Sequence, residues 1–357
     1  MTRAWSEVEF AQKVIAYYHQ SGRKDLPWQN TQDPYRIWLS EIMLQQTQVK
    51  TVIPYYQKFL QAFPSVLDLA NAEQDQVLHL WSGLGYYSRA RNLHKAAKMI
   101  RDEFAGQFPE NQAELESLPG IGRSTAGAIA AFAFNKPSAI LDGNVKRVLA
   151  RCFAIEGWYG QTTVLNQLWE LSEKLTPNQE TAGYNQAMMD LGALVCKRSK
   201  PLCQECPLTA HCLAFQQDRV SELPHKKPKK ARPAKSVYWL IYLDKQRILL
   251  QKRPPSGIWG GLWSLPEVER TEAVKQNYSS ARRLPEILHK FSHYDLHITP
   301  LLMNKTIEKT MQQEPNMSIM EADSSDWYSL TEPLEELAIG LPTPVTNLLK
   351  QLKQTLE

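Results

Sequence analysis

The sequence lacks the long apolar runs that membrane proteins need. Its longest apolar runs, such as residues 126–134, are far shorter than the roughly 20 residues with which a helix crosses a bilayer. The first ten residues, MTRAWSEVEF, also lack the apolar stretch of an export signal. Both absences argue against a membrane or exported protein, and the sequence predicts a cytoplasmic one without membrane contact.

A strong charge bias is absent as well. The 357 residues include 41 Lys and Arg against 37 Asp and Glu, which leaves a net charge of +4. This weak bias towards anionic partners is shared by many enzymes that act on small substrates. The ten Trp and fourteen Tyr are more informative, because flat side chains can stack on nucleic-acid bases or wedge between them.

Cysteine is scarce, and most of it lies in one short segment. Cys196, Cys203, Cys206 and Cys212 have the spacing C-x6-C-x2-C-x5-C, whereas Cys152 stands alone. Four thiolates this close in sequence can bind one metal centre with little loss of chain entropy. Disulfides are disfavoured in a cytoplasmic protein. The spacing fits either a tetrahedral zinc ion or a 4Fe-4S cluster.

Strand-like patterns are missing from the first two thirds of the chain. From Phe10 to about Phe215, apolar residues recur every three or four positions between short breaks that contain Pro or Gly. This pattern predicts an all-α bundle of roughly ten helices. Residues 224–235, PHKKPKKARPAK, contain no large apolar side chain, which indicates a basic tether. The alternative is a strap that contacts DNA phosphates.

The pattern of residue types changes again after Ser236. The apolar, β-branched segments VYWLIYL and RILLQKR are separated by residues 244–246, which predicts a β-hairpin. HITPLLM is a further strand candidate, and a closing helix is expected from near Pro344. The last third of the chain is therefore predicted to be an α+β domain.

Glu41 is the first of two carboxylic acids that suggest chemistry. On a helix its neighbours would be Ile37, Trp38 and Leu44, which form an apolar face. Loss of solvent raises the pKa of a carboxyl group, and a Glu that stays protonated near neutral pH can act as a general acid. The alternative is a Glu at a helix edge, paired with an Arg or a Lys.

Asp142 is the second carboxylic acid, in the segment AILDGNVKRVLARCF. It precedes a helix that is expected to begin near Val145, and it is therefore a natural N-cap. The same position, beside backbone N–H groups and the helix dipole, favours a charged carboxylate. An anion next to a sugar can stabilise an oxocarbenium ion or attack it. One neutral and one charged carboxyl group are typical of acid and anion roles.

Two glycine-bearing segments are typical of DNA contact. In LPGIGRSTAGAI, Gly120 and Gly122 can offer backbone N–H groups to a phosphate, and Arg123 can add charge. In GLGYY, residues 83–87, a glycine pair allows close backbone approach and projects an aromatic side chain. We expect Tyr86 to be a wedge between bases and Tyr87 to lie in the core.

The cysteine spacing and the Leu-Pro-Gly-Ile-Gly turn together resemble the endonuclease III superfamily of DNA glycosylases. SEIMLQQTQV and LDGNVKRVLAR resemble its MutY-type adenine DNA glycosylase family, and KRPPSGIWGGLWSLP resembles the start of a Nudix-type domain. The resemblance implies an all-α helix-hairpin-helix glycosylase with a 4Fe-4S cluster, followed by an α+β Nudix-like domain. The implied parts are a helical glycosylase domain at 1–218, a basic linker at 219–235 and an 8-oxoguanine-reading domain at 236–357. Within the helical domain, the implied parts are a six-helix lobe at about 27–137 and an iron–sulfur lobe made of 1–26 and 138–218.

The resemblance also implies an activity and a set of site residues. Members of this family excise adenine mispaired with 8-oxoguanine or guanine in duplex DNA and leave an abasic site. The protein is expected to be a monomer that associates with the nucleoid through DNA. By this resemblance, Glu41 protonates adenine at N7, Asp142 carries the charged or covalent sugar intermediate, and Asn144 orients these groups. Ser124 occupies the place where strand-cleaving relatives carry a Lys amine, which implies a monofunctional enzyme. The implied adenine pocket is lined by Leu26, Trp28, Val49 and Gln186. The implied DNA- and lesion-binding residues are Gln46, Thr47, Tyr86, Gly120, Gly122, Phe291, Ser292 and His293. The implied cluster ligands are Cys196, Cys203, Cys206 and Cys212.

Three other functions compete with this one. A bifunctional glycosylase/lyase needs a Lys amine to form a Schiff base. A Nudix pyrophosphatase needs an acidic R-E-x-x-E-E helix that holds Mg²⁺, and residues 267–287, EVERTEAVKQNYSSARRLPEI, do not contain one. The third alternative is a DNA-binding protein without catalysis.

Overall fold

The computed structural model describes residues 5–228, 231–270, 278–303 and 325–356. The chain divides into two compact units. The first consists of Met1–Ala70 and Lys95–Lys229, and the second of Asn71–His94 and Lys230–Glu357. A short segment from the helical part of the sequence thus belongs to the same unit as the C-terminal part of the chain.

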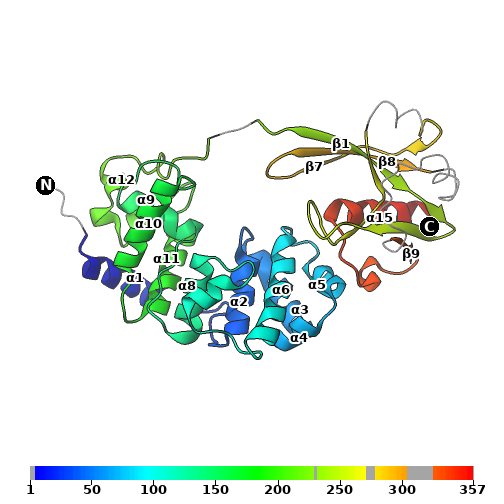
Figure 1. The fold of residues 1–357 in the computed structure, drawn as a ribbon. Coiled ribbons are helices and arrows are strands. Elements are labelled where there is room, and N and C mark those ends of the chain that lie inside the picture. Colours follow the sequence, from blue (N-terminus) through cyan, green and yellow to red (C-terminus); the bar gives the residue numbers. More distant parts are fainter. Residues whose placement is uncertain (1–4, 229–230, 271–277, 304–324, 357) are drawn as a thin grey trace. The chain divides into compact units, whose positions relative to one another are not determined.

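All regular structure described between residues 5 and 228 is helical, as predicted (Figure 1). The α-helices of this stretch are α1 Glu7–Ser21, α2 Pro34–Leu44, α3 Val49–Ala62, α4 Val66–Asn71, α5 Gln74–Trp81, α6 Ser88–Glu103, α7 Gln112–Ser117, α8 Arg123–Phe134, α9 Gly143–Cys152, α10 Thr162–Leu175, α11 Thr181–Asp190 and α12 Leu213–Gln216. A π-helical turn, η1 Leu191–Val195, continues α11, and the 3-10 turns η2 Cys203–Glu205 and η3 Thr209–His211 lie among the cysteines. None of the described helices is long and apolar enough to span a membrane.

Helix α9 shows how the core of the first unit supports the candidate site. It begins at Gly143, two residues earlier than expected, because the Asp142 side chain accepts hydrogen bonds from the first free backbone N–H groups. Val145, Val148 and Leu149 recur at helical spacing and are buried in one core with α1, α10 and α11. Full burial of each such side chain contributes about 1.5–3 kcal/mol. This packing fixes the start of α9, where Asp142 lies.

The described residues of the second unit form two β-sheets (Figure 1). In the first sheet the strand order is β5-β1-β8-β6, and β7 also pairs with β8; in the second the order is β2-β3-β4, and β9 pairs with β3. The strands are β1 Ala234–Ile241, β2 Leu243–Asp244, β3 Arg247–Lys252, β4 Trp263–Ser264, β5 Glu267–Glu269, β6 Arg282–Arg283, β7 Ile287–Lys290, β8 Asp295–Leu302 and β9 Ser325–Ser329. The unit also contains the 3-10 turn η5 Leu334–Leu337 and the closing helix α15 Thr343–Leu356, close to where the sequence predicts it.

The predicted β-hairpin forms only in part. Both apolar segments are strands, but β1 pairs in parallel with β8, and only the two-residue β2 pairs with β3. The physical reason lies in the burial of β1, since its residues from Val237 to Ile241 are all buried. A strand that is buried on both faces has a continuous apolar sequence and is typical of a central strand with parallel pairing, not of a hairpin arm.

Ion pairs connect the first residues of the predicted linker 219–235 to the first unit. Arg219 and His225 both form ion pairs with Glu156 of the first unit, at the start of the predicted linker 219–235. Strand β1 begins at Ala234, within the last residues of that range. Residues 229–230 lie outside the described part of the chain.

Residues 71–94 pack against the C-terminal part of the second unit. Asp75 on α5 accepts a hydrogen bond from Nε1 of Trp263 at 3.2 Å, and its Oδ1 lies 2.7 Å from Nζ of Lys252. Arg91 on α6 donates to the carbonyl oxygen of Gly260 at 2.7 Å. These polar contacts join the loop that carries Tyr86 to the β-sheet part of the same unit.

Candidate active site

A cavity of about 1110 Å³ opens in the first unit, and residues from α2, α8, α11 and the start of α9 line it. Ten of the site residues expected from the sequence line this one cavity, although they come from segments far apart in the chain. They are Leu26, Trp28, Glu41, Gln46, Thr47, Val49, Ser124, Asp142, Asn144 and Gln186.

Glu41 reaches the cavity from helix α2. The helix begins at Pro34, after the N-cap Asp33, and its Ile37 and Trp38 are 3% and 0% exposed. Burial, and to a lesser extent the nearby Asp142, raise the pKa of Glu41 to about 7. Among the described residues, the groups that shift this pKa include no Arg or Lys, which favours a desolvated acid over a Glu paired with a cation. The carboxyl group can therefore hold a proton near neutral pH.

Asp142 is the N-cap of α9. Its Oδ1 accepts hydrogen bonds from the backbone N–H groups of Asn144 at 3.0 Å and Val145 at 2.8 Å. Its Oδ2 accepts a third hydrogen bond from Nδ2 of Asn144 at 3.0 Å. The capping role expected from the sequence is therefore present, and the same three donors hold the carboxylate in place at the edge of the cavity.

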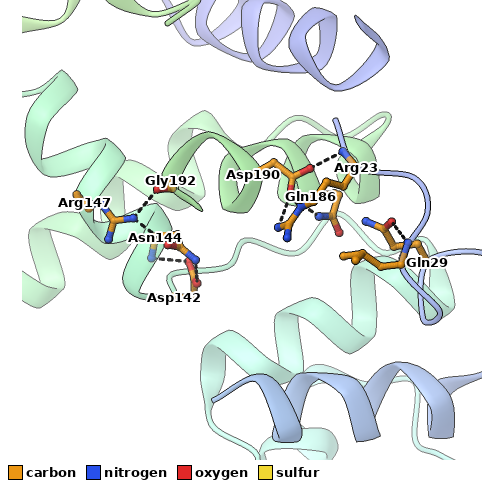
Figure 2. Close-up of polar contacts among 9 residues, drawn as sticks. Arg23, Gln29, Asp142, Asn144, Arg147, Gln186, Asp190 and Gly192 are labelled. Carbon is orange, nitrogen blue, oxygen red and sulfur yellow. Dashed lines mark hydrogen bonds and ion pairs between the residues drawn. The ribbon is translucent and has the colours of Figure 1, made fainter. Parts of the chain in front are cut away.

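A chain of hydrogen bonds extends from Asp142 through Asn144 and Arg147 to Gly192 (Figure 2), and Arg147 also reaches the cysteine segment. Arg147 donates from NH2 to Oδ1 of Asn144 at 2.8 Å and to the carbonyl oxygen of Gly192 at 2.6 Å. Its Nε donates to the carbonyl oxygen of Cys196 at 2.7 Å. Arg147 thus ties the first turn of α9 to η1 and to the first cysteine. Arg147 was not among the predicted site residues, because its partners lie 45 and 49 residues away in the sequence.

Ser124 contacts the backbone that leads into Asp142. Its Oγ accepts a hydrogen bond from the backbone N–H of Leu141 at 2.9 Å. Ser172 on α10 donates to the carbonyl oxygen of Ile140 at 2.7 Å. Two hydroxyl groups from different helices therefore fix the extended segment just before the carboxylate.

Gln186 belongs to a second polar network beside the cavity (Figure 2). Its Nε2 donates to Oδ1 of Asp190 at 2.9 Å, and Arg23 donates to the same carboxylate from its backbone N–H and its guanidinium group. Arg23 also lines the cavity, as does Gln29, whose Oε1 accepts from the backbone N–H of Leu26 at 3.1 Å. Arg23, Gln29 and Asp190 were not among the predicted site residues. The Arg23–Asp190 pair spans 167 residues and leaves no local signal in the sequence.

The expected apolar wall of the pocket is largely closed to solvent. Leu26 and Trp28 are buried, and the Trp28 ring packs edge-on against Tyr56 with 5.3 Å between centroids. Val49 is the first residue of α3. Gln46 is exposed and has a backbone φ of 58°, so it projects from a tight turn between α2 and α3.

The glycine turn before α8 lies on the surface of the first unit. Gly120 is exposed and has a φ of 82°, a conformation that favours glycine, and Gly122 is the N-cap of α8. Arg123 does not point freely to solvent, since it forms an ion pair with Glu173 and lies over the Trp169 ring at 4.1 Å. The charge that Arg123 was expected to offer a phosphate is therefore partly neutralised.

The expected wedge lies in the second unit. Tyr86 is 49% exposed, with a φ of 48°, and the Arg89 guanidinium lies 5.6 Å from its ring centroid. Tyr87 is only 7% exposed and donates its hydroxyl to the carbonyl oxygen of Leu341 at 3.2 Å. The two tyrosines therefore have the exposures that the sequence analysis expects.

The segment Phe291-Ser292-His293 forms the turn between β7 and β8. The Phe291 ring packs against Trp259 and Tyr294, with centroids 5.1 and 4.9 Å apart. Ser292 and His293 are exposed. A cluster of aromatic side chains thus supports two polar side chains at the surface of the second unit.

The four clustered cysteines line one small cavity together with Cys152, which the sequence analysis had set apart. Arg151 donates from NH1 to the Sγ of Cys196 at 3.3 Å and to the carbonyl oxygen of Lys197 at 2.8 Å. Within the described residues, no set of three or more Cys, His, Asp or Glu side chains is arranged to hold a metal ion. The structure therefore gathers the thiols at one place without itself identifying a bound group.

Comparison with known proteins identifies the family. Residues 39–174 match the family described as HhH-GPD superfamily base excision DNA repair protein, and residues 237–351 match the NUDIX domain family. The chain is 43% identical over 355 residues to the adenine DNA glycosylase of Buchnera aphidicola subsp. Baizongia pistaciae, an alignment that covers 97% of each chain. The chain belongs to the adenine DNA glycosylase family. It is also 34% identical to the adenine DNA glycosylase of Homo sapiens, over 80% of this chain and 65% of that one.

A solved structure supports the fold of the first unit. A thermostable thymine-DNA glycosylase has a TM-score of 0.54 and 29% identity, and covers 59% of this chain and 97% of its own. The predicted fold class, a helical helix-hairpin-helix glycosylase followed by an α+β Nudix-like domain, is confirmed. The sequence predicted that residues 267–287 do not form the acidic helix of an active Nudix hydrolase. Part of this segment, 271–277, lies outside the described residues.

In this member of the adenine DNA glycosylase family, the predicted site residues fall into three groups. The acids and pocket residues surround one cavity of the first unit. The cysteines line a second, smaller cavity of that unit. Tyr86 and the segment 291–293 belong to the second unit.

Proposed function

We propose that the protein is a monofunctional adenine DNA glycosylase, active as a monomer. Its substrate is adenine mispaired with 8-oxoguanine or guanine in duplex DNA, and its product is an abasic site. The observation that carries the proposal is the pair of acids at one cavity. Glu41 has a pKa raised to about 7, and Asp142 is fixed by three hydrogen bonds. One acid that can be neutral beside one fixed carboxylate is the arrangement that glycosidic-bond hydrolysis needs.

The reaction begins when adenine leaves the base stack and enters the cavity. Glu41 donates its proton to N7 of adenine, which makes the base a better leaving group. The bond between N9 and the sugar breaks, and its electron pair leaves with the base. The Asp142 carboxylate stabilises the oxocarbenium ion or bonds to it transiently, and a water molecule completes the hydrolysis. Asn144, hydrogen-bonded to Asp142, keeps that carboxylate oriented.

The proposed reaction stops at the abasic site because Ser124 has no amine with which to form a Schiff base. Its hydroxyl is already an acceptor for the Leu141 N–H. We expect borohydride to trap little or no protein on substrate DNA. Efficient, stoichiometric trapping would contradict the monofunctional assignment.

The activity is tested by single-turnover excision on duplexes that differ only in the base opposite adenine. The variants Glu41→Gln and Asp142→Asn should bind the duplex with 8-oxoguanine opposite adenine, yet fail to release adenine. Glu170→Gln, an exposed position on α10, is the matched control and should excise at the rate of the unmodified protein. Retained turnover in both active-site variants would refute the assignment.

Contacts with DNA are assigned to surface features of both units. Gly120 and Gly122 offer backbone N–H groups to a phosphate, and Tyr86 fills the gap that the flipped base leaves. Gln46 is assigned a second intercalating role, and Thr47 a contact with the base opposite adenine. Replacement of Tyr86 by Ala should slow excision at saturating enzyme, because the unstacked state loses its support.

The turn Phe291-Ser292-His293 is assigned to recognition of 8-oxoguanine. Ser292 and His293 can hydrogen-bond to the modified purine, while Phe291 supports them from below. The double variant Ser292→Ala/His293→Ala should lower the preference for 8-oxoguanine over guanine, with excision opposite guanine preserved. Release of pyrophosphate from 8-oxo-dGTP in Mg²⁺ would instead favour a Nudix hydrolase.

We assign a 4Fe-4S cluster to Cys196, Cys203, Cys206 and Cys212. Four thiols that line one largely apolar cavity are a suitable donor set for it, and the Arg151 guanidinium beside the Cys196 sulfur offsets thiolate charge. The bound cluster would be structural and would hold the cysteine segment in shape for DNA. Iron and sulfide analysis should give a full cluster in the unmodified protein and little iron in Cys203→Ser; stoichiometric zinc would contradict the assignment.

A further inference from the structure

The end of the Gln186 amide that faces the cavity is set by a neighbouring residue. Gln186 lies on α11 and lines the cavity. Its Nε2 donates to Oδ1 of Asp190, one helical turn further along, at 2.9 Å. With the amide nitrogen bound there, the carbonyl oxygen Oε1 is the end that remains for a ligand, and it can only accept a hydrogen bond.

Asp190 is held firmly enough to impose this orientation. The residue is 0% exposed. Arg23 donates to it three times, from the backbone N–H at 2.8 Å, from Nε at 2.8 Å and from NH2 at 2.6 Å. A carboxylate is acceptor-only, so the amide beside it must present its NH2 group. Without that carboxylate, the two ends of the amide could exchange, since they have nearly the same shape.

We infer that Asp190, fixed by Arg23, is a positioning residue that makes Gln186 an obligate acceptor and thereby selects 6-amino purines over 6-oxo purines. Adenine carries a donor, the N6 amino group, at this edge, whereas guanine and hypoxanthine carry the O6 acceptor. An O6 atom opposite Oε1 would bring two acceptors together with no proton between them. Burial of such an unmatched pair is costly, so the 6-oxo base is rejected. This inference rests on the proposed function, because it concerns the adenine site itself.

The test measures a ratio of rates, so that differences in leaving-group chemistry cancel between proteins. Single-turnover excision by the full-length chain is measured on duplexes with either adenine or hypoxanthine opposite 8-oxoguanine. Asp190→Asn keeps the size of the side chain but offers both a donor and an acceptor, so the Gln186 amide can turn over. The ratio of adenine to hypoxanthine excision should fall by roughly 10- to 100-fold in this variant.

A compensating change separates orientation from mere structural support. The double variant Asp190→Asn/Gln186→Glu places a carboxylate at position 186, which is an acceptor at both oxygens whichever way it turns. The new amide at position 190 can donate to it. The ratio should therefore recover towards that of the unmodified protein, although the Arg23 ion pair is still altered. A role of Asp190 in stability alone predicts no recovery.

Two further variants complete the design. Glu180→Gln is the matched control. It makes the same acid-to-amide change at the N-cap of α11 and also removes an ion pair to α1, that with His19 at 3.0 Å, but at an exposed position. Its ratio should not change. Gln186→Met removes the acceptor and leaves the Arg23–Asp190 pair intact, so the ratio should fall in this variant even where Asp190→Asn does not fold by circular dichroism.

The possible failures are distinguishable. If the unmodified protein releases no adenine, the proposed function is wrong. If it releases adenine but Gln186→Met keeps the original ratio, the amide does not read the 6-position and the inference is overturned. The inference is equally overturned if a folded Asp190→Asn keeps the original ratio, or if the double variant does not regain it.

Discussion

The substitution Glu41→Gln should make the protein more stable at alkaline pH while it abolishes excision. Burial, together with the nearby Asp142, raises the pKa of Glu41 from 4.5 to about 7, so the folded state holds the proton where the unfolded chain has already lost it. Between these pH values, the folded state binds more protons than the unfolded state, and stability therefore falls as pH rises. The loss is complete once the pH passes the folded pKa. Gln does not ionise, so it has no such loss of stability at any pH.

The size of the effect follows from the two pKa values. Their difference, 7 − 4.5, is about 2.5 units, and at 1.36 kcal/mol per unit this amounts to about 3 kcal/mol. Glu41 lines an open cavity and keeps some exposure, so solvent screening lowers the expected gain to about 2 kcal/mol. The gain should be present at pH 8 and disappear near pH 4.5.

Calorimetry on the full-length chain at pH 5 and pH 8 measures this gain. The chain has two units, so more than one transition is expected, and only the transition of the first unit should shift. Glu170→Gln, an exposed change on α10, should leave the stability unaltered at both pH values. An equal gain for Glu41→Gln at pH 5 and pH 8, or no gain at pH 8, would refute the reasoning.

Three further predictions concern rate and stability. Excision should slow as pH rises above about 7, because Glu41 loses the proton that it donates; a single-turnover profile that is flat to pH 9 would contradict this. Asp75→Ala removes the acceptor of the Trp263 indole and should lower the free energy of unfolding of the second unit by about 1–3 kcal/mol, measured by tryptophan fluorescence in urea. An unchanged midpoint would count against that contact. Ser124→Ala leaves the Leu141 N–H without its acceptor and should slow excision with duplex affinity intact; weaker binding in fluorescence anisotropy at an unchanged rate would argue for a DNA contact instead.

The helical part of the fold follows from local sequence physics, whereas the sheet pairing does not. Apolar residues recur about once per helical turn, so each helix can be predicted from its own segment. Val145, Val148 and Leu149 show this pattern in α9. The pairing of β1 with β8 joins segments about sixty residues apart, as Ala234 opposite Asp295 illustrates. Nothing in VYWLIYL specifies that parallel partner, so the sequence predicted only the local hairpin, which forms between β2 and β3.

The candidate site also has features that local sequence predicts and features that it does not. The desolvation of Glu41 could be foreseen from its apolar helix neighbours, and the capping role of Asp142 from its place before a helix. The pocket residues and the lesion-reading turn 291–293 came from a family resemblance, whereas Gly120, Gly122 and Tyr86 could also be predicted from their glycine-bearing segments. The Arg23–Asp190 pair could not be foreseen by either route, because an ion pair across 167 residues depends on the packing of α11 against the N-terminal segment. Such long-range polar contacts are the part of a site that only coordinates reveal.

Ser124 connects the proposed DNA-binding turn to the chemistry proposed for the cavity. Helix α8 begins directly after its N-cap Gly122, and Ser124 lies in its first turn. Its hydroxyl accepts the N–H of Leu141, the residue before Asp142, so this side chain helps to place the carboxylate. A protonated Lys amine has three donors and no acceptor, and it could not replace the hydroxyl in that hydrogen bond. The position that withholds an amine from the sugar therefore also holds the backbone of Asp142. In the proposed mechanism, excision without strand cleavage and correct placement of the anion thus depend on one hydroxyl group.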